Sequence, residues 1–488
     1  MKSQHVFICA LLALGCSAEH TGEDDEAGVE ELGVTQQALC PGGQGEFSGV
    51  LTYTRNTPTD AIDCSSAPGA RVPCSAHGTK FTFGPAILRA TNTTSGISTD
   101  INVGAAGNYI ACLAAGNYTT KVGFRDGRQV LNAGEQDLTG PASIALRGAT
   151  LNTEVYSNVG GTHTVPSGGS KVFNFNFSTG TFASLRANMY MLAQLLKNVW
   201  LNTYGASSIL CPTSGDCFRT RIQDRTGAAG GNGYCFGTGS TSKCVHDVGL
   251  QFGVSGTGVL FHEMGHGIDA VTTIRARGFA RMIDSGSVDC NGAANPHSGN
   301  ASSALGEGLA NWIEALTMYS PTTVPTFPYG QQCNSYKYPP TGSQPAAFAC
   351  GSNAIPTDEY AVSKALIDLV DANTVANAAG CRNEQVQVSP LQVLLGLQAF
   401  TANATIPPGQ PCSGLKGIEE GGVNEGSVCA ASTPNWPYQG GQTLETISQS
   451  GLLDLLGKLK TAGINGTALR DIWANSGWQP ADSAVQLP

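Results

Sequence analysis

The chain has 488 residues, and its 36 acidic and 26 basic side chains give a formal net charge of −10 at pH 7. Charged residues make up only 13% of the chain, about half the usual share, while hydrophobic residues make up 41%. The apolar content is ample for a folded core, and the length exceeds that of one ordinary domain. No basic patch indicates nucleic-acid binding.

The chain begins with an export signal at residues 1–15. Lys2 precedes an apolar run at residues 6–14, and small residues at the end of this run lead to Cys16. The arrangement resembles a bacterial lipoprotein signal, which implies that Cys16 is lipidated, becomes the mature N-terminus and anchors the protein at the outer face of the cell envelope. An ordinary secretory signal is the alternative. Both interpretations predict an exported protein.

Residues 16–39 are predicted to form a disordered acidic tether. They contain seven acidic residues, no lysine or arginine and no aromatic residue. The tether therefore accounts for most of the net negative charge, and the folded body that follows it is only mildly acidic.

The cysteines indicate a disulfide-bonded chain. There are 16 in all, and the 14 that remain after Cys9 and Cys16 of the signal are an even number. Cysteines of exported proteins usually form disulfides, and the absence of any C-x-x-C pair argues against a structural zinc ribbon. Proximity along the sequence suggests the pairs Cys64/Cys74, Cys211/Cys217, Cys235/Cys244, Cys333/Cys350 and Cys412/Cys429.

Residues 40–135 alternate between apolar and polar positions in short segments separated by many turn residues, which predicts a β-sandwich. The order of the runs T-D, G-N-Y and A-G-N-Y-T is similar to that in the prealbumin-like accessory domains of exported bacterial peptidases. Residues 136–180 add further strands, either as a second small β unit or as the edge of the catalytic part. His77 and His163 are expected to be solvent-facing loop residues without a chemical role.

The apolar spacing changes near residue 181, and residues 182–204 follow a helical pattern. The run R-A-N-M-Y-M-L-A-Q-L-L resembles the helix that opens the catalytic domain of fungalysin-like metallopeptidases, so residues 181–320 are assigned to such a domain. That family has an edge strand that binds substrate backbone beside the cleft, and residues 248–253 are the candidate. His246 and Asp247 could bind a further ion, but a turn is the favoured interpretation. Structural calcium is a second expected cofactor, with no residues assigned to it.

The run His262-Glu263-Met264-Gly265-His266 has the pattern H-E-x-x-H. On a helix, this spacing places the two imidazoles one turn apart on the same face, where both can bind one metal ion. A zinc ion there lowers the pKa of bound water, and Glu263 can take the proton as that water attacks a carbonyl. The alternative is a buried helix whose histidines only form hydrogen bonds.

A catalytic zinc ion needs a third protein ligand, and Glu307 is the candidate. It lies in a second amphipathic helix at residues 304–312, whose G-E-G-x-A-x-x context resembles the glutamate helix of gluzincin metallopeptidases of the thermolysin and fungalysin type. The resemblance implies that Glu307 binds zinc and that Asn311 orients a histidine, although the family usually has aspartate there. Glu314 is the rival ligand, and Asp269 is a candidate to support the ligands.

Residues 321–488 are predicted to form a mainly helical lobe, with helices at residues 359–369, 390–400 and 452–460. By the same resemblance, this lobe closes the cleft. A peptidase also needs a donor to the oxyanion that develops on the attacked carbonyl. Tyr360 is the first candidate and His297 the second.

We therefore expect a multidomain α+β protein with an N-terminal β-sandwich, a zincin-like catalytic domain and a helical C-terminal lobe. The expected function is a monomeric zinc metallopeptidase that cleaves extracellular or cell-surface proteins, with Glu263 as general base. One alternative is a zinc exopeptidase, and the other is a lipid-anchored binding protein with a catalytically silent peptidase fold. The expected partners are a protein or peptide substrate and, through Cys16, the lipid membrane.

Overall fold

The computed structural model describes residues 40–55, 69–126, 144–147, 155–211, 219–224, 230–236, 243–252, 256–277, 280–281, 301–323, 359–371, 386–401, 404–405, 446–448 and 451–475. The chain divides into two units, Met1–Leu39 and Cys40–Pro488. The predicted signal and tether, and the pairs Cys333/Cys350 and Cys412/Cys429, lie outside the described residues. Within the described residues, no helix is both long and apolar enough to cross a membrane.

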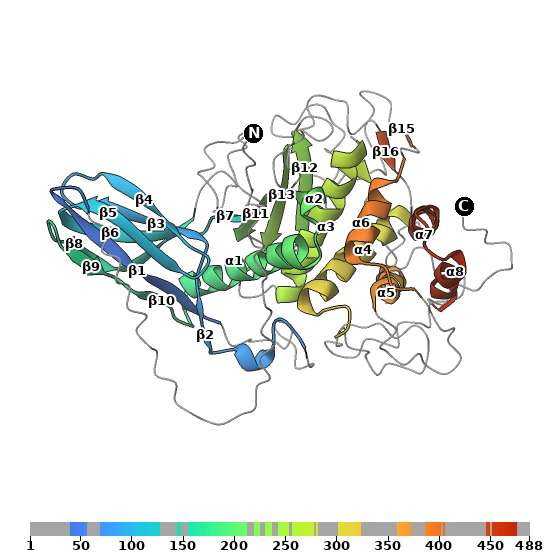
Figure 1. The fold of residues 1–488 in the computed structure, drawn as a ribbon, viewed down its shortest axis with the longest axis horizontal. Coiled ribbons are helices and arrows are strands. Elements are labelled where there is room, and N and C mark those ends of the chain that lie inside the picture. The colour runs from blue at the N-terminus through green and yellow to red at the C-terminus, as the bar shows by residue number, and fades with distance from the viewer. Residues whose placement is uncertain are drawn as a thin grey trace, which may run out of the picture. The chain divides into compact units, whose positions relative to one another are not determined.

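The N-terminal part of the Cys40–Pro488 unit is rich in strands, as predicted, and helices follow it (Figure 1). In one sheet, the long β1 pairs with β2, β5, β9 and β10, and a second sheet has the order β4-β3-β6-β8. Buried and exposed side chains alternate along β6 and β8, so one face of their sheet packs into the core. The strands are β1 (Gln44–Thr54), β2 (Lys80–Thr82), β3 (Ala86–Asn92), β4 (Ser98–Val103), β5 (Asn108–Ala114), β6 (Gly116–Gly123), β8 (Tyr156–Val165), β9 (Ser170–Val172) and β10 (Phe175–Phe177).

The segment at residues 170–177 completes the first sheet. Both β9 and β10 pair with β1 in parallel, so they belong to this N-terminal sheet. From the same predicted segment, β7 (Ile144–Arg147) instead forms an edge of a third sheet among the described strands. The expectation for His163 is wrong, because this residue lies in β8 and is only 8% exposed. Its Nε2 lies 3.2 Å from Thr120 Oγ1, and its ring centroid lies 4.0 Å from that of Phe173.

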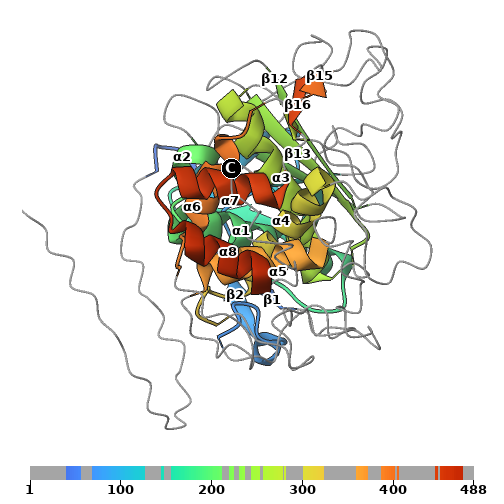
Figure 2. The same ribbon diagram turned by 90° about the vertical axis from the view of Figure 1, so that its right-hand side faces the viewer.

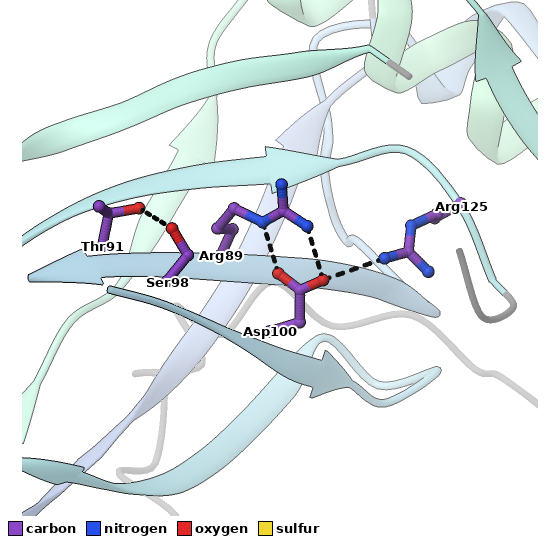
Figure 3. A network of polar contacts seen from close by, with 5 residues as sticks. All are labelled: Arg89, Thr91, Ser98, Asp100 and Arg125. Atoms are coloured by element: carbon purple, nitrogen blue, oxygen red, sulfur yellow. Dashed lines mark hydrogen bonds and ion pairs between the residues drawn. The ribbon is translucent and has the colours of Figure 1, made fainter. Parts of the chain in front are cut away.

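A polar network fixes the register of β3 against β4 (Figure 3). Arg89 and Asp100 are paired residues of the two strands, and the guanidinium donates to both carboxylate oxygens at 2.6 and 2.8 Å. Arg125 adds a third contact to Asp100 at 3.1 Å, and Thr91 and Ser98 form a neighbouring hydroxyl pair at 2.8 Å. Hydrogen bonding to Arg89 outweighs partial burial and lowers the pKa of the Asp100 carboxyl. This network lies within the β region and includes no residue of the helices.

The helices that apolar spacing predicts are present. Thr181 caps the first of them, because its Oγ1 accepts a hydrogen bond from Ser184 N at 3.1 Å, and a Ser389 capping box precedes Pro390 at the start of another. In Figure 2, α7 and α8 lie nearest the viewer, where α7 packs on α6 and α8 on α5. The helices are α1 (Phe182–Asn198), which continues into a π-helical turn, η3 (Val199–Thr203), then α2 (Ser207–Leu210), α3 (Thr257–Arg277), α4 (Ala301–Met318), α5 (Glu359–Val370), α6 (Pro390–Gln398), α7 (Leu452–Thr461) and α8 (Gly466–Asn475).

A third sheet lies beside α3, with the order β12-β13-β11-β7. The strands β7, β11 and β13 are parallel, and β12 runs antiparallel to β13. This last pairing places Cys235 opposite Cys244, and the disulfide between them stays a prediction. The strands are β7 (Ile144–Arg147), β11 (Arg219–Asp224), β12 (Gly230–Phe236) and β13 (Lys243–Leu250); three short strands, β14 (Ala280–Arg281), β15 (Ala404–Thr405) and β16 (Thr446–Ser448), form a small separate sheet.

Two predictions about β13 are wrong. Residues 248–253 do not provide an edge strand, because β13 lies between β11 and β12 and its Val248 and Leu250 are buried. His246 and Asp247 do not form a turn, because both belong to β13. His246 is two residues from Val248 and is fully buried in phase with it. Strand order depends on pairing between distant segments, which local patterns do not contain.

The β region and α1 share one hydrophobic core. The ring of Phe83, which follows β2, lies 4.9 Å from that of Phe177 in β10 and 5.7 Å from that of Tyr190 in α1. Lys197, near the end of α1, donates to the buried Asp126 carboxylate at 2.6 Å. The N-terminal β region is therefore packed against the helical part.

One disulfide among the described residues joins Cys40 to Cys112 of β5. The two cysteines are 72 residues apart, so pairing by sequence proximity does not find them. Cys74 and Cys211 are also disulfide-bonded, and the partners predicted for these two lie outside the described residues.

Candidate metal centre

The H-E-x-x-H helix and the glutamate helix, α3 and α4, pack side by side. His266 and His262, one turn apart on α3, both approach Glu307 of α4, and His262 also contacts Asn311, one turn after Glu307. Residues four apart lie on the same face of a helix. The two helices therefore run antiparallel and bring together the residues that the sequence analysis selected on each.

The two helices come very close at Gly265, between the histidines. A Cβ atom there would lie 2.9 Å from Ala310 Cα and 3.2 Å from Ala310 O. Glycine is the one residue without a Cβ, so it permits this approach of the backbones. The short distance between the helices lets the face of α3 that carries the two histidines meet the face of α4 that carries Glu307.

Three donor atoms form a nearly equilateral triangle. The Nε2 atoms of His262 and His266 are 3.1 Å apart, and Glu307 Oε2 lies 3.3 and 3.5 Å from them. Zinc binds nitrogen and carboxylate oxygen at roughly 2.0–2.2 Å, so two donors of a tetrahedral site lie roughly 3.3–3.6 Å apart. The three distances fit one face of such a site. Two imidazoles and one carboxylate are also the donor set of a catalytic zinc ion with an open fourth position.

The buried polar atoms around the triangle also fit a cation. Glu307 Oε1 is buried and has no hydrogen-bond partner among the described residues, so the carboxylate lacks full compensation for its burial. His262 Nδ1 lies 2.9 Å from Asn311 Oδ1, an oxygen that can only accept. His262 therefore donates from Nδ1 and keeps the Nε2 lone pair for an ion, as expected of an orienting partner. Asn311 supplies this hydrogen bond without the charge of an aspartate.

The charges of the three residues stabilise one another. Burial alone would raise the pKa of the Glu307 carboxyl, but the two histidines outweigh it and lower that pKa to about 2. Burial would lower the pKa of both imidazoles, yet Glu307 outweighs it and raises the pKa of His262 and of His266 above the ordinary 6.5. Protons on the imidazoles and a metal ion therefore compete for the same positions.

Three further buried ionisable residues interact electrostatically with His266. The carboxylates of Glu263 and Asp269 are buried, and both raise the pKa of His266. Burial and the charge of His266 lower the pKa of His246 to about 3, so this histidine is neutral. Sequence reasoning placed Asp269 near the site, but it considered His246 only for a separate ion or a turn. The alternation of side chains along β13 could have predicted that His246 is buried, because His246 is in phase with the buried Val248 and Leu250.

Glu314, the rival ligand, lies outside the triangle. Glu314 is buried on α4, but its carboxyl lies against Gly258 at the start of α3 and is not part of the triangle. Burial raises the pKa of Glu314 to about 8. Tyr360 belongs to the first turn of α5, but its side chain, like all of His297, lies outside the described part of the chain. Within that part, His262, His266 and Glu307 are the one cluster suited to a metal ion, so a calcium site stays a prediction.

Comparison with known proteins adds little. No protein-family model and no curated protein matches this chain. A crystal structure of a DUF3823 family protein from Parabacteroides merdae is similar over 28% of this chain, with 14% sequence identity and a TM-score of 0.13. The match spans 46% of that protein's length. A similarity this low carries no argument about fold or function.

Proposed function

We propose that the protein is a zinc-dependent peptidase with a zincin-like catalytic domain of the gluzincin type. The observation that supports this most is the triangle of His262 Nε2, His266 Nε2 and Glu307 Oε2, whose edges of 3.1, 3.3 and 3.5 Å suit a tetrahedral zinc ion. These three residues would hold the ion. Bound there, zinc supplies a Lewis acid that polarises a scissile carbonyl and acidifies an attacking water molecule.

Glu263 would be the general base. Its buried carboxylate follows His262 directly in the chain, and its charge raises the pKa of both histidines. It takes a proton from the water as the water oxygen bonds to the carbonyl carbon. It then delivers a proton to the amide nitrogen as the C–N bond breaks. Asn311 holds the His262 ring in the orientation that this reaction requires.

The substrate would bind as an extended peptide along β12. This strand pairs with β13 alone among the described strands, and it packs beside α3. An edge strand offers backbone N–H and C=O groups that a peptide can pair with, whatever its side chains. A substrate bound in this way would lie next to the helix that carries His262 and His266. The proposed site therefore suits an endopeptidase that acts on exported or cell-surface proteins.

The test measures zinc content and casein cleavage in the wild type and three matched variants. Glu263→Gln should retain zinc and lose cleavage by a factor of about 10² or more, because the general base is lost. Glu307→Gln should lose both zinc and cleavage. Glu314→Gln removes a buried carboxyl from the same helix outside the triangle and should keep both.

Other results would change the assignment. A zinc-loaded wild type that cleaves neither casein nor short peptides supports the lipid-anchored binding protein. Cleavage of short peptides from one end only, with casein intact, supports an exopeptidase. A wild type without stoichiometric metal would remove both enzymatic interpretations.

A further inference from the structure

The C-terminal end of α4 is held by an arginine from the N-terminal β region. Arg71 Nη1 donates to Leu316 O at 2.6 Å and also to Tyr319 O, and Arg71 N donates to Met318 O at 2.7 Å. The last carbonyl groups of a helix have no partner within the helix, and they carry the negative end of its dipole. A guanidinium is well suited to this end, because it offers several donors and a permanent positive charge.

The segment after α1 holds the same end of α4. Tyr204 Oη donates to Leu316 O at 2.7 Å and lies 3.3 Å from Arg71 Nη2, so it contacts both the helix end and the arginine. Trp200 Nε1 donates to Thr317 Oγ1 at 3.0 Å, and all of Trp200 is buried. We name Arg71, Tyr204 and Trp200 the α4 clamp. The clamp ties α4 to both the β region and the π-helical turn η3.

We propose that Arg71 is a positioning residue of the metal centre, which it supports by fixing the axis of α4. This inference rests on the proposed zinc site. Two points define the axis near the ligands: the close contact of Gly265 with Ala310, and the clamp at Leu316. Glu307 lies on the other side of Ala310 from the clamp, on the same rigid helix.

The size of the expected shift at Glu307 follows if α4 is treated as a rigid rod that pivots at Ala310. At 1.5 Å per residue, Leu316 is about 9 Å along the axis from Ala310, and Glu307 is about 4.5 Å from it in the opposite direction. If the clamp is lost and the helix end moves by about 1 Å, the backbone of Glu307 shifts by about 0.5 Å. Metal–ligand distances tolerate only about 0.2 Å. A modest movement at the clamp therefore disturbs the zinc geometry.

The experiment uses the full chain with Arg71→Met, which removes the charge and the donors, and Arg71→Lys, which keeps the charge but replaces the planar guanidinium by a single ammonium group. Tyr204→Phe removes one hydroxyl of the clamp and keeps the ring. The control is Arg89→Met, because Arg89 belongs to the same β region and forms a two-contact ion pair with Asp100 in a network that includes no residue of α4 (Figure 3). The readouts are the zinc dissociation constant, the visible spectrum of the cobalt-substituted protein, and hydrogen exchange of α4 in the metal-free protein.

Arg71→Met should weaken zinc binding about tenfold or more, change the cobalt spectrum and speed hydrogen exchange in the last turn of α4. Arg71→Lys and Tyr204→Phe should show smaller changes of the same kind, and Arg89→Met should show none. The inference is overturned if the folded Arg71 variants and Tyr204→Phe bind zinc and show cobalt spectra as the wild type does. A wild type that binds no zinc would instead overturn the proposed function and this inference with it.

Discussion

Replacing Gly265 by alanine tests whether the close approach of α3 and α4 sets the geometry of the metal site. The added Cβ would lie 2.9 Å from Ala310 Cα, whereas carbon atoms pack best at about 3.5–4.0 Å. The helices must therefore separate by roughly 0.6–1.1 Å. Glu307 lies one turn from Ala310, so the distances of 3.3 and 3.5 Å from its Oε2 to the two imidazoles should grow toward about 4 Å.

Such a separation is several times the tolerance of about 0.2 Å for a metal–ligand distance. We expect the zinc dissociation constant to rise 10- to 100-fold, which corresponds to about 1.4–2.7 kcal/mol. The effect on folding should be smaller. Overpacking costs about 1–3 kcal/mol, and the better helix propensity of alanine offsets about 1 kcal/mol of that. Zinc affinity should therefore fall more clearly than the stability of the metal-free protein.

The assay combines chelator competition for zinc with urea unfolding of the metal-free protein. Gly466→Ala is the matched control, because a Cβ at this position of α8 meets nothing closer than Lys460 Cδ at 3.5 Å. The control should bind zinc as the wild type does. If Gly265→Ala also binds zinc within about threefold of the wild type, the helix separation does not control the site, and the reasoning fails.

Three further predictions concern charge and hydrogen bonding. Because the pKa values of His262 and His266 are raised above 6.5, zinc affinity should weaken as the pH falls through the raised values, and zinc binding should release protons. Calorimetry in buffers of different ionisation enthalpy would detect the released protons. A zinc affinity that does not depend on pH would contradict this prediction. Asn311→Ala should weaken zinc binding 10- to 100-fold, whereas Asn311→Asp should preserve or strengthen it, as measured by chelator competition. Equal zinc affinities of the wild type and both variants would exclude an orienting role of Asn311. Glu314 keeps its proton up to about pH 8 when folded but ionises near 4.5 when unfolded, so its burial costs stability progressively as the pH rises between these values. Glu314→Gln should therefore stabilise the metal-free protein more at about pH 8 than at about pH 5, and a urea unfolding series with the same difference at both pH values would refute the shift.

Several features of this protein follow from local sequence patterns. The four-residue spacing of His262 and His266 places both imidazoles on one face of α3. The amphipathic run around Glu307 and Asn311 does the same for α4. The strand-rich N-terminal region and the later helices were equally predictable, because period and capping residues act over a few positions. These patterns select His262 and His266, and the resemblance of the Glu307 context to gluzincins adds the third metal-binding candidate.

Tertiary structure decided everything that depends on distant segments. It placed β13 inside its sheet, buried His163 and His246, and joined Cys40 to Cys112. It also brought the backbones of α3 and α4 so close at Gly265 that a Cβ atom would not fit there, and it placed Arg71 of the β region at the C-terminal end of α4. Local sequence specifies the conformation of a segment and the face that it buries. Which faces meet, and at what distance, depends on the packing of the whole chain, and the geometry of the candidate metal site is set at that level.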